Sequence, residues 1–545
     1  MTLPAWADKL IALYQSHAAN QFLLYGNVND RFLLDGKTLG SLPDFLHRVI
    51  LPRFDVILSY DLGNGVRIEK GAEIVTKWPA YRESAELPRA PRPATEWLTR
   101  FFRYTANLAK LGQTPHQVGF YMKGAHLVAP ALPGALNYDL SALAMLMRDW
   151  AADDHLTRHS LATFLIAENL NDLHPLLVNH PRAAPVEVPL PSTGELRDGL
   201  TLFANEHALV LSEFAPAYDT IAHQLTGTTL TSVENLLRMK SHRKEVLHAG
   251  DLVTMRKELV EKDSAGLIEF IESKRTLDDY NAQERLKTWL RQDIKLWHMN
   301  DVQALPMGYL LCGPVGTGKT YLVECLAGEA GVPVVKLKNF RDKWVGSTEG
   351  NLEKIFRLLK GLGRCFVFID EADQALGKRD AGSGDSGLSG RIYGMFAEQM
   401  SNPANRGRIV WILASSRPDL IEVDLKRPGR VDVKIPIFPT TTASEGFALI
   451  RALAKRRSVE LQESDFAAVE PLIPKLLTPG AAESIAVKLY RSVRTGGLNA
   501  VDALRDTLET YQTPVPPDVM EFQIALAARE ASDGDFVPEA FRHLR

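Results

Sequence analysis

The sequence predicts an α/β protein of two three-layer αβα modules, each built on a parallel sheet and followed by a small helical lid. The chain has 545 residues, more than one hydrophobic core usually organises. Short apolar runs, such as CFVFI at 365–369, are typical of strands buried on both faces of a parallel sheet. Similar runs recur in both halves, and 44 residues separate both Lys123 from Ala167 (167 − 123) and Asp370 from Ala414 (414 − 370). An internal repeat of one α/β unit accounts for these observations.

The composition narrows the classes of function. A net charge of −3 provides no overall positive field for nucleic acid or an anionic membrane. The three cysteines, Cys312, Cys325 and Cys365, form no CxxC pair, which argues against a disulfide framework and against a zinc site. No apolar run approaches the roughly 18 residues of a membrane span, and the N-terminus lacks the pattern of a signal peptide. We therefore expect a cytoplasmic protein without a membrane span.

A phosphate-binding loop (P-loop) is predicted in the second half. An apolar run at 309–312 precedes a glycine-rich loop, and a helical pattern follows it. The glycines let successive backbone N–H groups point at phosphate oxygens, and the start of the helix adds partial positive charge. Lys319 can reach the outer phosphates, and the hydroxyl of Thr320 can bind Mg²⁺. The predicted nucleotide-binding residues are Gly313, Pro314, Val315, Gly316, Thr317, Gly318, Lys319, Thr320 and Tyr321.

The next buried strand ends in a pair of acidic residues, Asp370 and Glu371. An aspartate at this point can hold Mg²⁺ together with Thr320, and the glutamate that follows can orient and polarise the attacking water. The pair therefore predicts a metal site and a catalytic base beside the phosphate loop.

Downstream of the acidic pair, the chain resembles the AAA family of ATPases within the AAA+ class. A buried strand leads to Ser416, and the run Arg427-Pro-Gly-Arg430 follows. The resemblance implies that both arginines act as arginine fingers on the γ-phosphate bound by the neighbouring subunit. It also implies a ring, most often a homo-hexamer, with ATP, ADP and Mg²⁺ as ligands. Ser416 stands where the family usually has asparagine, and Val431 where it has phenylalanine, so slow or regulated hydrolysis stays open.

The same resemblance assigns two further segments. Similar motors carry an aromatic-apolar-glycine loop that faces the pore of the ring and grips a peptide, and Trp344, Val345 and Gly346 match it. The segment from 477 to 490 resembles the helical lid, whose first turn closes over the nucleotide at Gly480 and Ala481. Over most of its length the chain resembles bacterial Cdc48/SpoVK-like AAA proteins with tandem modules.

The first copy of the repeat keeps the strands but lacks the residues that would touch nucleotide. Residues 21–26 parallel the strand before the phosphate loop, but no Gly-Lys-Thr follows them. Lys123 and Gly124 stand in place of the acidic pair, and His180 and Ala183 in place of the two arginines. We therefore predict a pseudo-ATPase first module and one nucleotide per chain.

Four domains are predicted from these elements. They are a degenerate AAA module at 1–200 with an insertion near 60–100, a helical lid and connector at 201–262, a catalytic AAA module at 263–440, and a lid with a C-terminal helix at 441–545. The insertion is rich in arginine, proline and tryptophan, which makes it a candidate surface for a protein partner.

The predicted function is an ATP-hydrolysing motor that remodels, unfolds or disassembles a protein substrate through the pore of a ring. An alternative is a nucleotide-regulated assembly scaffold or chaperone with slow ATPase activity, for which a link to phage-tail-like contractile injection particles is a family-level suggestion. A nucleic-acid motor is less favoured, because the net charge is near neutral and no DNA-binding helix pair is recognisable.

Overall fold

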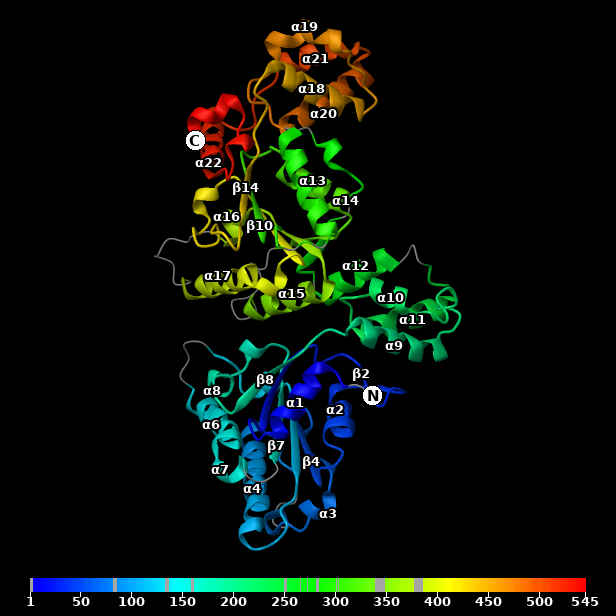
Figure 1. Ribbon diagram of the computed structural model, residues 1–545, viewed down its shortest axis with the longest axis vertical. Helices are drawn as coiled ribbons and strands as arrows, with labels where there is room; N and C mark the ends of the chain where they lie inside the picture. The colour runs from blue at the N-terminus through cyan, green and yellow to red at the C-terminus, as the bar shows by residue number, and fades with distance from the viewer. Residues whose placement is uncertain are drawn as a thin grey trace. The chain divides into compact units, whose positions relative to one another are not determined.

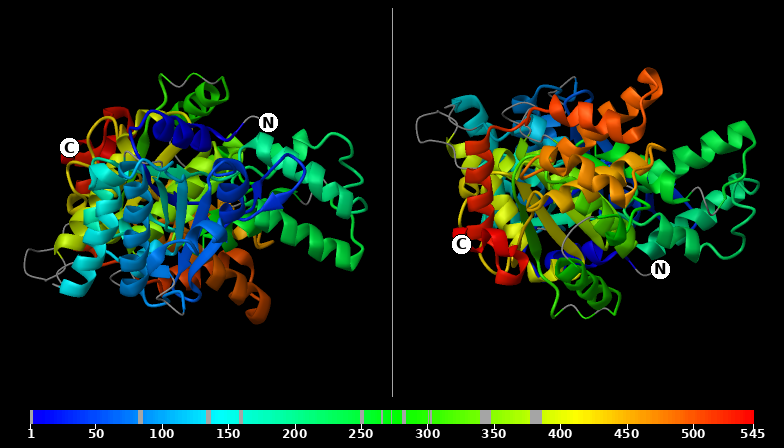
Figure 2. Two further views of the ribbon diagram at one scale, coloured as in Figure 1. Left: turned by 90° about the horizontal axis from the view of Figure 1, so that it is seen from below. Right: turned by 90° about the horizontal axis from the view of Figure 1, so that it is seen from above.

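A computed structural model describes residues 3–81, 86–132, 137–157, 161–248, 252–264, 266–271, 273–280, 284–299, 301, 303–338, 348–376 and 386–545. The chain divides into two compact units (Figures 1 and 2). The first comprises Met1–Ser264 with Gly346–Leu362, and the second comprises Ala265–Val345 with Gly363–Arg545. Across the described ranges, every helix is too short or too polar to cross a membrane.

The first unit is built on a six-stranded sheet. Its strands are β1 (Gln21–Gly26), β4 (Val56–Asp61), β5 (Gly65–Lys70), β6 (Val118–Lys123), β7 (Leu161–Ile166) and β8 (Ala183–Val188). They lie in the order β5-β4-β6-β7-β1-β8, and all pairs are parallel except the edge pair of β5 with β4. A separate short hairpin joins β2 (Phe32–Leu33) to β3 (Leu39–Gly40).

Helices cover both faces of this sheet. They are α1 (Ala5–Gln15), α2 (Leu42–Phe45), α3 (Ala72–Val75), α4 (Pro91–Lys110), α5 (Ala125–Val128), α6 (Tyr138–Ala152), α7 (Asp154–Thr157) and α8 (Pro175–Val178). The first unit also includes α15 (Thr348–Leu362), from later in the chain, which contacts residues 170–172 after β7. On one face, Trp6 of α1 shares a core cluster with Phe22 of β1. On the other, Trp150 of α6 packs edge-on against Phe120 of β6 and Phe102 of α4. The sheet and these two helical layers form one αβα sandwich.

The second unit repeats this sheet. Its strands are β9 (Ile268–Ile271), β10 (Gly308–Cys312), β11 (Val334–Leu337), β12 (Cys365–Ile369), β13 (Ile409–Ser415) and β14 (Val433–Pro436). Their order is β14-β10-β13-β12-β11-β9, again parallel except for the edge strand β9. Read in the opposite direction, the first sheet has the order β8-β1-β7-β6-β4-β5, so that β14 corresponds to β8, β10 to β1, and so on to β9 and β5. The predicted fold class of two αβα modules with parallel sheets is therefore confirmed.

Alternate side chains of β13 show why the apolar strands must lie inside the second unit. Val410 and Ile412 join the core beneath α13 (Glu284–His298) and α14 (Lys319–Ala330). Trp411 points the other way, and its ring meets Phe396 of α17 (Ser386–Ser401) with centroids 6.0 Å apart. Because both faces of the strand are covered, its sequence is apolar throughout. A short helix, α16 (Ala372–Leu376), follows β12.

Each sheet is followed by a small helical domain with its own core. The first contains α9 (Thr193–Glu206), α10 (Asp219–Gln224), α11 (Leu230–Arg243) and α12 (Leu252–Asp263). The second contains α18 (Ala443–Lys455), α19 (Phe466–Val469), α20 (Pro479–Gly496) and α21 (Ala500–Glu509). A last helix, α22 (Pro517–Glu530), packs on the second αβα module and not in its lid. The two predicted lids are therefore present.

The segment near 60–100 belongs to the core of the first unit. Its strand β5 occupies the same edge position as β9 in the second sheet. Trp78 and Trp97 are only 5% and 8% exposed, and their rings meet edge-on. The tryptophans that suggested a partner surface therefore stabilise the core, and a partner that binds this segment has to use its other residues.

Asp293 of α13 makes the stability of the second unit depend on pH. Its carboxylate accepts a hydrogen bond of 2.7 Å from the Tyr309 hydroxyl, and burial raises the pKa of Asp293 to about 6 from 3.8. A carboxyl group with a raised pKa in the folded state destabilises the fold progressively as the pH rises from about 4 to 6. We expect Asp293→Asn to increase the free energy of unfolding at pH 7 by about 1–2 kcal/mol, after allowance for solvent screening. Urea unfolding at about pH 4 and pH 7 checks this, and an equal gain at both pH values would contradict it.

Candidate active site

The phosphate loop joins the end of β10 to α14, in the predicted order of strand, loop and helix. Gly316 and Gly318 have φ angles of 81° and 84°, in the left-handed region that favours glycine. At Gly313 a Cβ atom would lie 2.1 Å from the carbonyl oxygen of Ile437, so no larger residue fits. These three glycines allow the turn that directs the loop and the first N–H groups of α14 toward one point.

The Lys319 side chain lies inside the phosphate loop. Its Nζ donates to the carbonyl oxygens of Gly313, at 2.8 Å, and Pro314, at 3.0 Å. Thr317 also donates from its hydroxyl to Pro314, at 2.8 Å. Burial lowers the pKa of Lys319 to about 8 from 10.5, because a desolvated ammonium group is costly. Bound phosphate oxygens would give this buried ammonium group a negatively charged partner.

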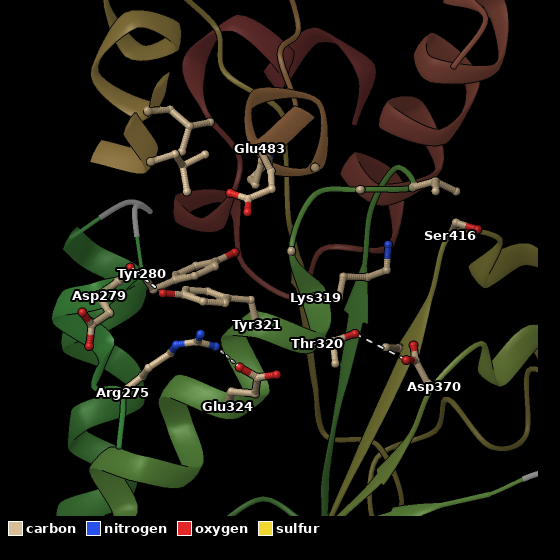
Figure 3. A pocket seen from close by; sticks show the side chains of 18 of the residues that line it. Arg275, Asp279, Tyr280, Lys319, Thr320, Tyr321, Glu324, Asp370, Ser416 and Glu483 are labelled. Atoms are coloured by element: carbon tan, nitrogen blue, oxygen red, sulfur yellow. Dashed lines mark hydrogen bonds and ion pairs between the residues drawn. The ribbon is translucent and has the colours of Figure 1, made fainter. Parts of the chain in front are cut away.

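The predicted magnesium ligands meet beside the loop. The Thr320 hydroxyl donates to Oδ2 of Asp370 at 3.3 Å (Figure 3). Both are hard oxygen ligands of the kind that Mg²⁺ prefers, so this pair fits the ion that the resemblance implies. The same Oδ2 atom also accepts a hydrogen bond from Lys336 of β11 at 3.0 Å. Lys336 was not predicted as a site residue, because only the pairing of β11 with β12 brings it to the acidic pair.

Glu371 has an unusual backbone conformation. Its φ angle is 47°, in the left-handed region that few residues other than glycine adopt. The matching residue at the end of β6 is Gly124, with a φ angle of 63°. Both modules therefore turn in the same way after this strand, but only the second places a carboxylate there at a conformational cost. Such strain is common at functional sites.

We expect Glu371→Gly to remove this strain while it removes the carboxylate. The variant should be at least as stable as the wild type, with a gain of up to about 1 kcal/mol in free energy of unfolding, and should have lost ATPase activity. Thermal unfolding and phosphate release measure the two effects. A clear loss of stability would show that Glu371 makes contacts that outweigh its backbone strain.

The sensor strand β13 ends in two serines with different surroundings. The Ser415 hydroxyl donates to Asp373 and also accepts the N–H of Arg417 at 2.9 Å, so it is occupied. Ser416 lies on the wall of the cavity described below, across the phosphate loop from α20 (Figure 3). Ser416 thus lies at the cavity, with a side chain that reaches less far than asparagine.

The two predicted arginine fingers share one carboxylate in this chain. Arg427 and Arg430 both form ion pairs with Asp424, which also accepts a hydrogen bond of 2.7 Å from the Tyr393 hydroxyl. Arg427 is 62% exposed, whereas Arg430 is 17% exposed. Neither arginine lines the cavity of its own chain. This placement fits residues that would act on a neighbour.

A cavity of about 680 Å³ opens between the phosphate loop and the lid (Figure 3). One wall is aromatic, because the rings of Tyr280 and Tyr321 stack with centroids 6.3 Å apart. Two guanidinium groups flank Tyr321: that of Arg275 lies 4.7 Å from the ring centroid, and that of Arg456 lies 5.6 Å away. Glu483 of α20 also lines the cavity. Of these residues only Tyr321 was predicted, since Arg275 and Tyr280 precede α13, Arg456 and Glu483 come from the lid, and they share no motif.

The lid contacts the phosphate loop directly. Gly480, at the start of α20, donates from its N–H to the carbonyl oxygen of Gly316 at 2.9 Å. Thr478 caps the helix by accepting the N–H of Ala481 at 3.2 Å. Of the two predicted lid residues, Gly480 lines the cavity, whereas Ala481 is buried behind it at 4% exposed. The predicted pore-loop residues, Trp344, Val345 and Gly346, lie outside the described residues.

The corresponding edge of the first sheet holds no such cradle. The N–H of Gly26, at the end of β1, donates to the carbonyl oxygen of Glu168 at 3.0 Å. Arg357 of α15, which belongs to the same compact unit, donates to the side-chain oxygen of Asn169 at 3.3 Å and lies in the field of Glu168 and Glu187. Where the second sheet has a phosphate loop, the first has a guanidinium group among carboxylates.

Comparisons with known proteins fall on both modules. Residues 1–189 match the family described as AAA+ chaperone, N-terminal Rossmann-like domain. Residues 309–438 match the ATPase family associated with various cellular activities (AAA).

Several curated proteins are similar to part of the chain. The Cell division cycle protein 48 homolog of Archaeoglobus fulgidus is 28% identical over 281 residues, 48% of this chain and 36% of that protein. The ATP-dependent zinc metalloprotease FtsH 1 of Salinibacter ruber is 34% identical over 195 residues, 33% of this chain and 28% of that protein. The ATP-dependent zinc metalloprotease FtsH of Lancefieldella parvula is 30% identical over 234 residues, 41% of this chain and 35% of that protein. The chain spans about a third of the length of these relatives.

The match over 309–438 covers the strands and loops that build the phosphate-binding side of the cavity. The matched range also includes the acidic pair at the cavity and the two arginines that pair with Asp424. The chain therefore combines an N-terminal domain of an AAA+ chaperone family with an ATPase domain of the AAA family.

Proposed function

We propose that this protein hydrolyses ATP to ADP and phosphate with Mg²⁺ and uses the energy to remodel a protein substrate. The observation that carries the proposal is the cavity beneath the lid, where the phosphate loop, the acidic pair and an aromatic wall converge. Thr320 and Asp370 would hold Mg²⁺, which would neutralise charge on the phosphates. Lys319 would bind the outer phosphates, and Glu371 would orient the attacking water.

The work on a protein substrate is supported by the relatives. One matched family is described as an AAA+ chaperone, and two of the similar proteins are ATP-dependent metalloproteases by name. We propose that copies of the chain form a ring, most often a homo-hexamer in this family, in which Trp344 grips the substrate. The exposure of Arg427, and its absence from its own cavity, favour catalysis across a subunit interface.

We also propose that the first module binds no nucleotide. Phosphates need backbone N–H groups and cations around them, whereas here Arg357, near Gly26, already lies in the electrostatic field of Glu168 and Glu187. Calorimetry with ATP and Mg²⁺ is therefore expected to give one site per chain. A stoichiometry of two would contradict this part of the proposal.

Lys319→Ala is expected to abolish ATP binding at that single site. The ammonium group is the main cation inside the loop, and its loss leaves the phosphate charge without a direct partner. We expect affinity to fall at least about a hundredfold, as for loss of a charge-assisted contact of about 3 kcal/mol. Calorimetry at matched Mg²⁺ measures it, with Lys360→Ala on the exposed side of α15 as the control. An unchanged affinity would show that the nucleotide lies elsewhere.

A slow, regulatory ATPase is the second candidate. Ser416 favours this candidate, because its hydroxyl extends less far than an asparagine amide and is less able to hydrogen-bond the attacking water. In that case nucleotide would mainly control the assembly of a scaffold or chaperone ring. Ser416→Asn separates the two proposals, because a large gain in turnover would show that the serine limits hydrolysis. Turnover that rises with a protein substrate and not with Ser416→Asn favours the motor.

A further inference from the structure

The C-terminal helix α22 presents one buried polar side chain to the phosphate loop. The buried side chains of this helix are Met520, Gln523, Ile524, Ala527 and Ala528, and Gln523 is only 6% exposed. Its Oε1 atom accepts the backbone N–H of Val315 at 3.1 Å. A glutamine in such a row is costly to bury unless it is hydrogen-bonded, and the phosphate loop supplies the bond.

This hydrogen bond completes the fixation of one peptide unit in the loop. The carbonyl oxygen of Pro314 accepts hydrogen bonds from Lys319, at 3.0 Å, and from the hydroxyl of Thr317, at 2.8 Å. The N–H of Val315 belongs to the same planar peptide unit, and Gln523 holds it from the opposite side. Both ends of the peptide unit are therefore fixed, and so is the position of the lysine that bonds to it.

Other contacts of α22 keep Gln523 in place. The Cys312 thiol, at the end of β10, lies 3.9 Å from the carbonyl oxygen of Ala527. At the end of the helix, Glu530 forms ion pairs with Lys426 and, at 3.0 Å, with Lys434. Lys426 is 8% exposed and directly precedes the first predicted arginine finger. The helix is therefore attached to β10, which leads into the loop, and to the neighbouring strand β14.

Phe522, next to Gln523, extends this contact to the sensor strand. The guanidinium group of Arg417 lies 5.2 Å from the centroid of the Phe522 ring. Arg417 directly follows Ser416, so α22 contacts both the loop that binds phosphate and the strand end that faces the cavity. The helix α22, which begins at Pro517 near the end of the sequence, thus lies behind the ATP site.

We propose that Gln523 is a positioning residue of the ATP site, which sets the shape of the phosphate loop before nucleotide binds. The inference rests on the proposed ATPase function. A glycine-rich loop loses conformational freedom when it closes around phosphates, and a loop that is already fixed loses less. Gln523 does not itself line the cavity, so it acts on the site through the Pro314–Val315 peptide unit.

Gln523→Leu tests the proposal, because leucine keeps the volume and removes the acceptor. We expect the affinity for ATP to fall about tenfold, as for one lost hydrogen bond to a partly buried amide. The KM for ATP should rise by a similar factor, while kcat stays within about twofold, since the acidic pair and the fingers are untouched. Hydrogen exchange of the 313–318 segment, measured without nucleotide, should become faster.

Two matched variants separate positioning from general stability. Glu521→Leu places the same residue on the exposed side of α22 and should change neither loop exchange nor ATP affinity. Gln523→Glu keeps an acceptor oxygen and should restore slow exchange of the loop. If Gln523→Leu lowers the melting temperature but leaves loop exchange and ATP affinity unchanged, Gln523 only packs in the core. If the variant binds ATP more tightly, the Gln523 side chain competes with phosphate for the loop.

The proposal can fail without the proposed function. If the wild-type chain binds and hydrolyses ATP but Gln523→Leu matches it in KM and loop exchange, only the role of Gln523 is wrong. If the wild-type chain neither binds nor hydrolyses ATP, the proposed function is wrong, and faster exchange of the loop in Gln523→Leu would then report only a structural contact.

Discussion

Glu371→Gln is expected to bind ATP as the wild type does and to hydrolyse it about 10²–10⁴-fold more slowly, the usual effect of removing a general base. The amide has nearly the shape of the carboxylate but cannot accept a proton from water. Glu371 lies at the cavity beside Asp370, and its N–H donates to Oδ1 of that residue at 3.1 Å, so the backbone contact survives the substitution. Binding should therefore be kept while turnover is lost.

Phosphate release under saturating ATP measures the turnover, and calorimetry measures the affinity. Glu398→Gln is the matched control, because it makes the same chemical change on the exposed side of α17. Near-normal turnover in Glu371→Gln would exclude Glu371 as the base. A parallel loss of affinity would instead indicate that the carboxylate helps to form the nucleotide site. We expect the variant also to hold ATP long enough to capture the protein substrate that the proposed function requires.

The parts of the site that could be predicted from the sequence depend on local geometry. The run from Gly313 to Thr320 contains its own turn, lysine and hydroxyl, and the acidic pair directly follows an apolar strand. Such motifs need only the adjacent strand and helix to bring their residues together. The repeat was predictable for the same reason, since buried parallel strands keep their apolar pattern after the nucleotide-binding residues are lost.

The residues that escaped prediction reach the site through long-range packing. Lys336 is brought to Asp370 by strand pairing, Arg456 reaches Tyr321 from the lid, and Gln523 reaches Val315 from 208 residues away in the chain. None of them lies in a motif, so no spacing could identify it. The tryptophans near 60–100 escaped for the opposite reason. Proline- and arginine-rich flanks suggested a surface, but burial depends on the sheet that forms beneath them.

Arg427→Ala/Arg430→Ala, the double variant of the finger loop, is expected to be about 10³–10⁵-fold less active than the wild type, the usual effect of an arginine finger. Both side chains pair with Asp424, and neither lines the cavity of its own chain. We therefore expect them to act on the γ-phosphate of the nucleotide that a neighbouring subunit binds. The pairing also predicts that the arginines must leave Asp424, or share it, to reach that phosphate.

Mixing two inactive variants tests this arrangement. Glu371→Gln subunits keep the fingers, and Arg427→Ala/Arg430→Ala subunits keep the base, so a head-to-tail ring of both restores complete sites at some interfaces. Random mixing in equal amounts should recover about a quarter of the wild-type activity, since only one of the four ordered neighbour pairs is complete. Adding Lys319→Ala to the finger variant removes its nucleotide site, and this triple variant should give no recovery. Without recovery in the first mixture, the arginines act within their own chain or only hold Asp424. With recovery that disappears on dilution, the ring is the active species, because the two halves of each site then come from separate chains.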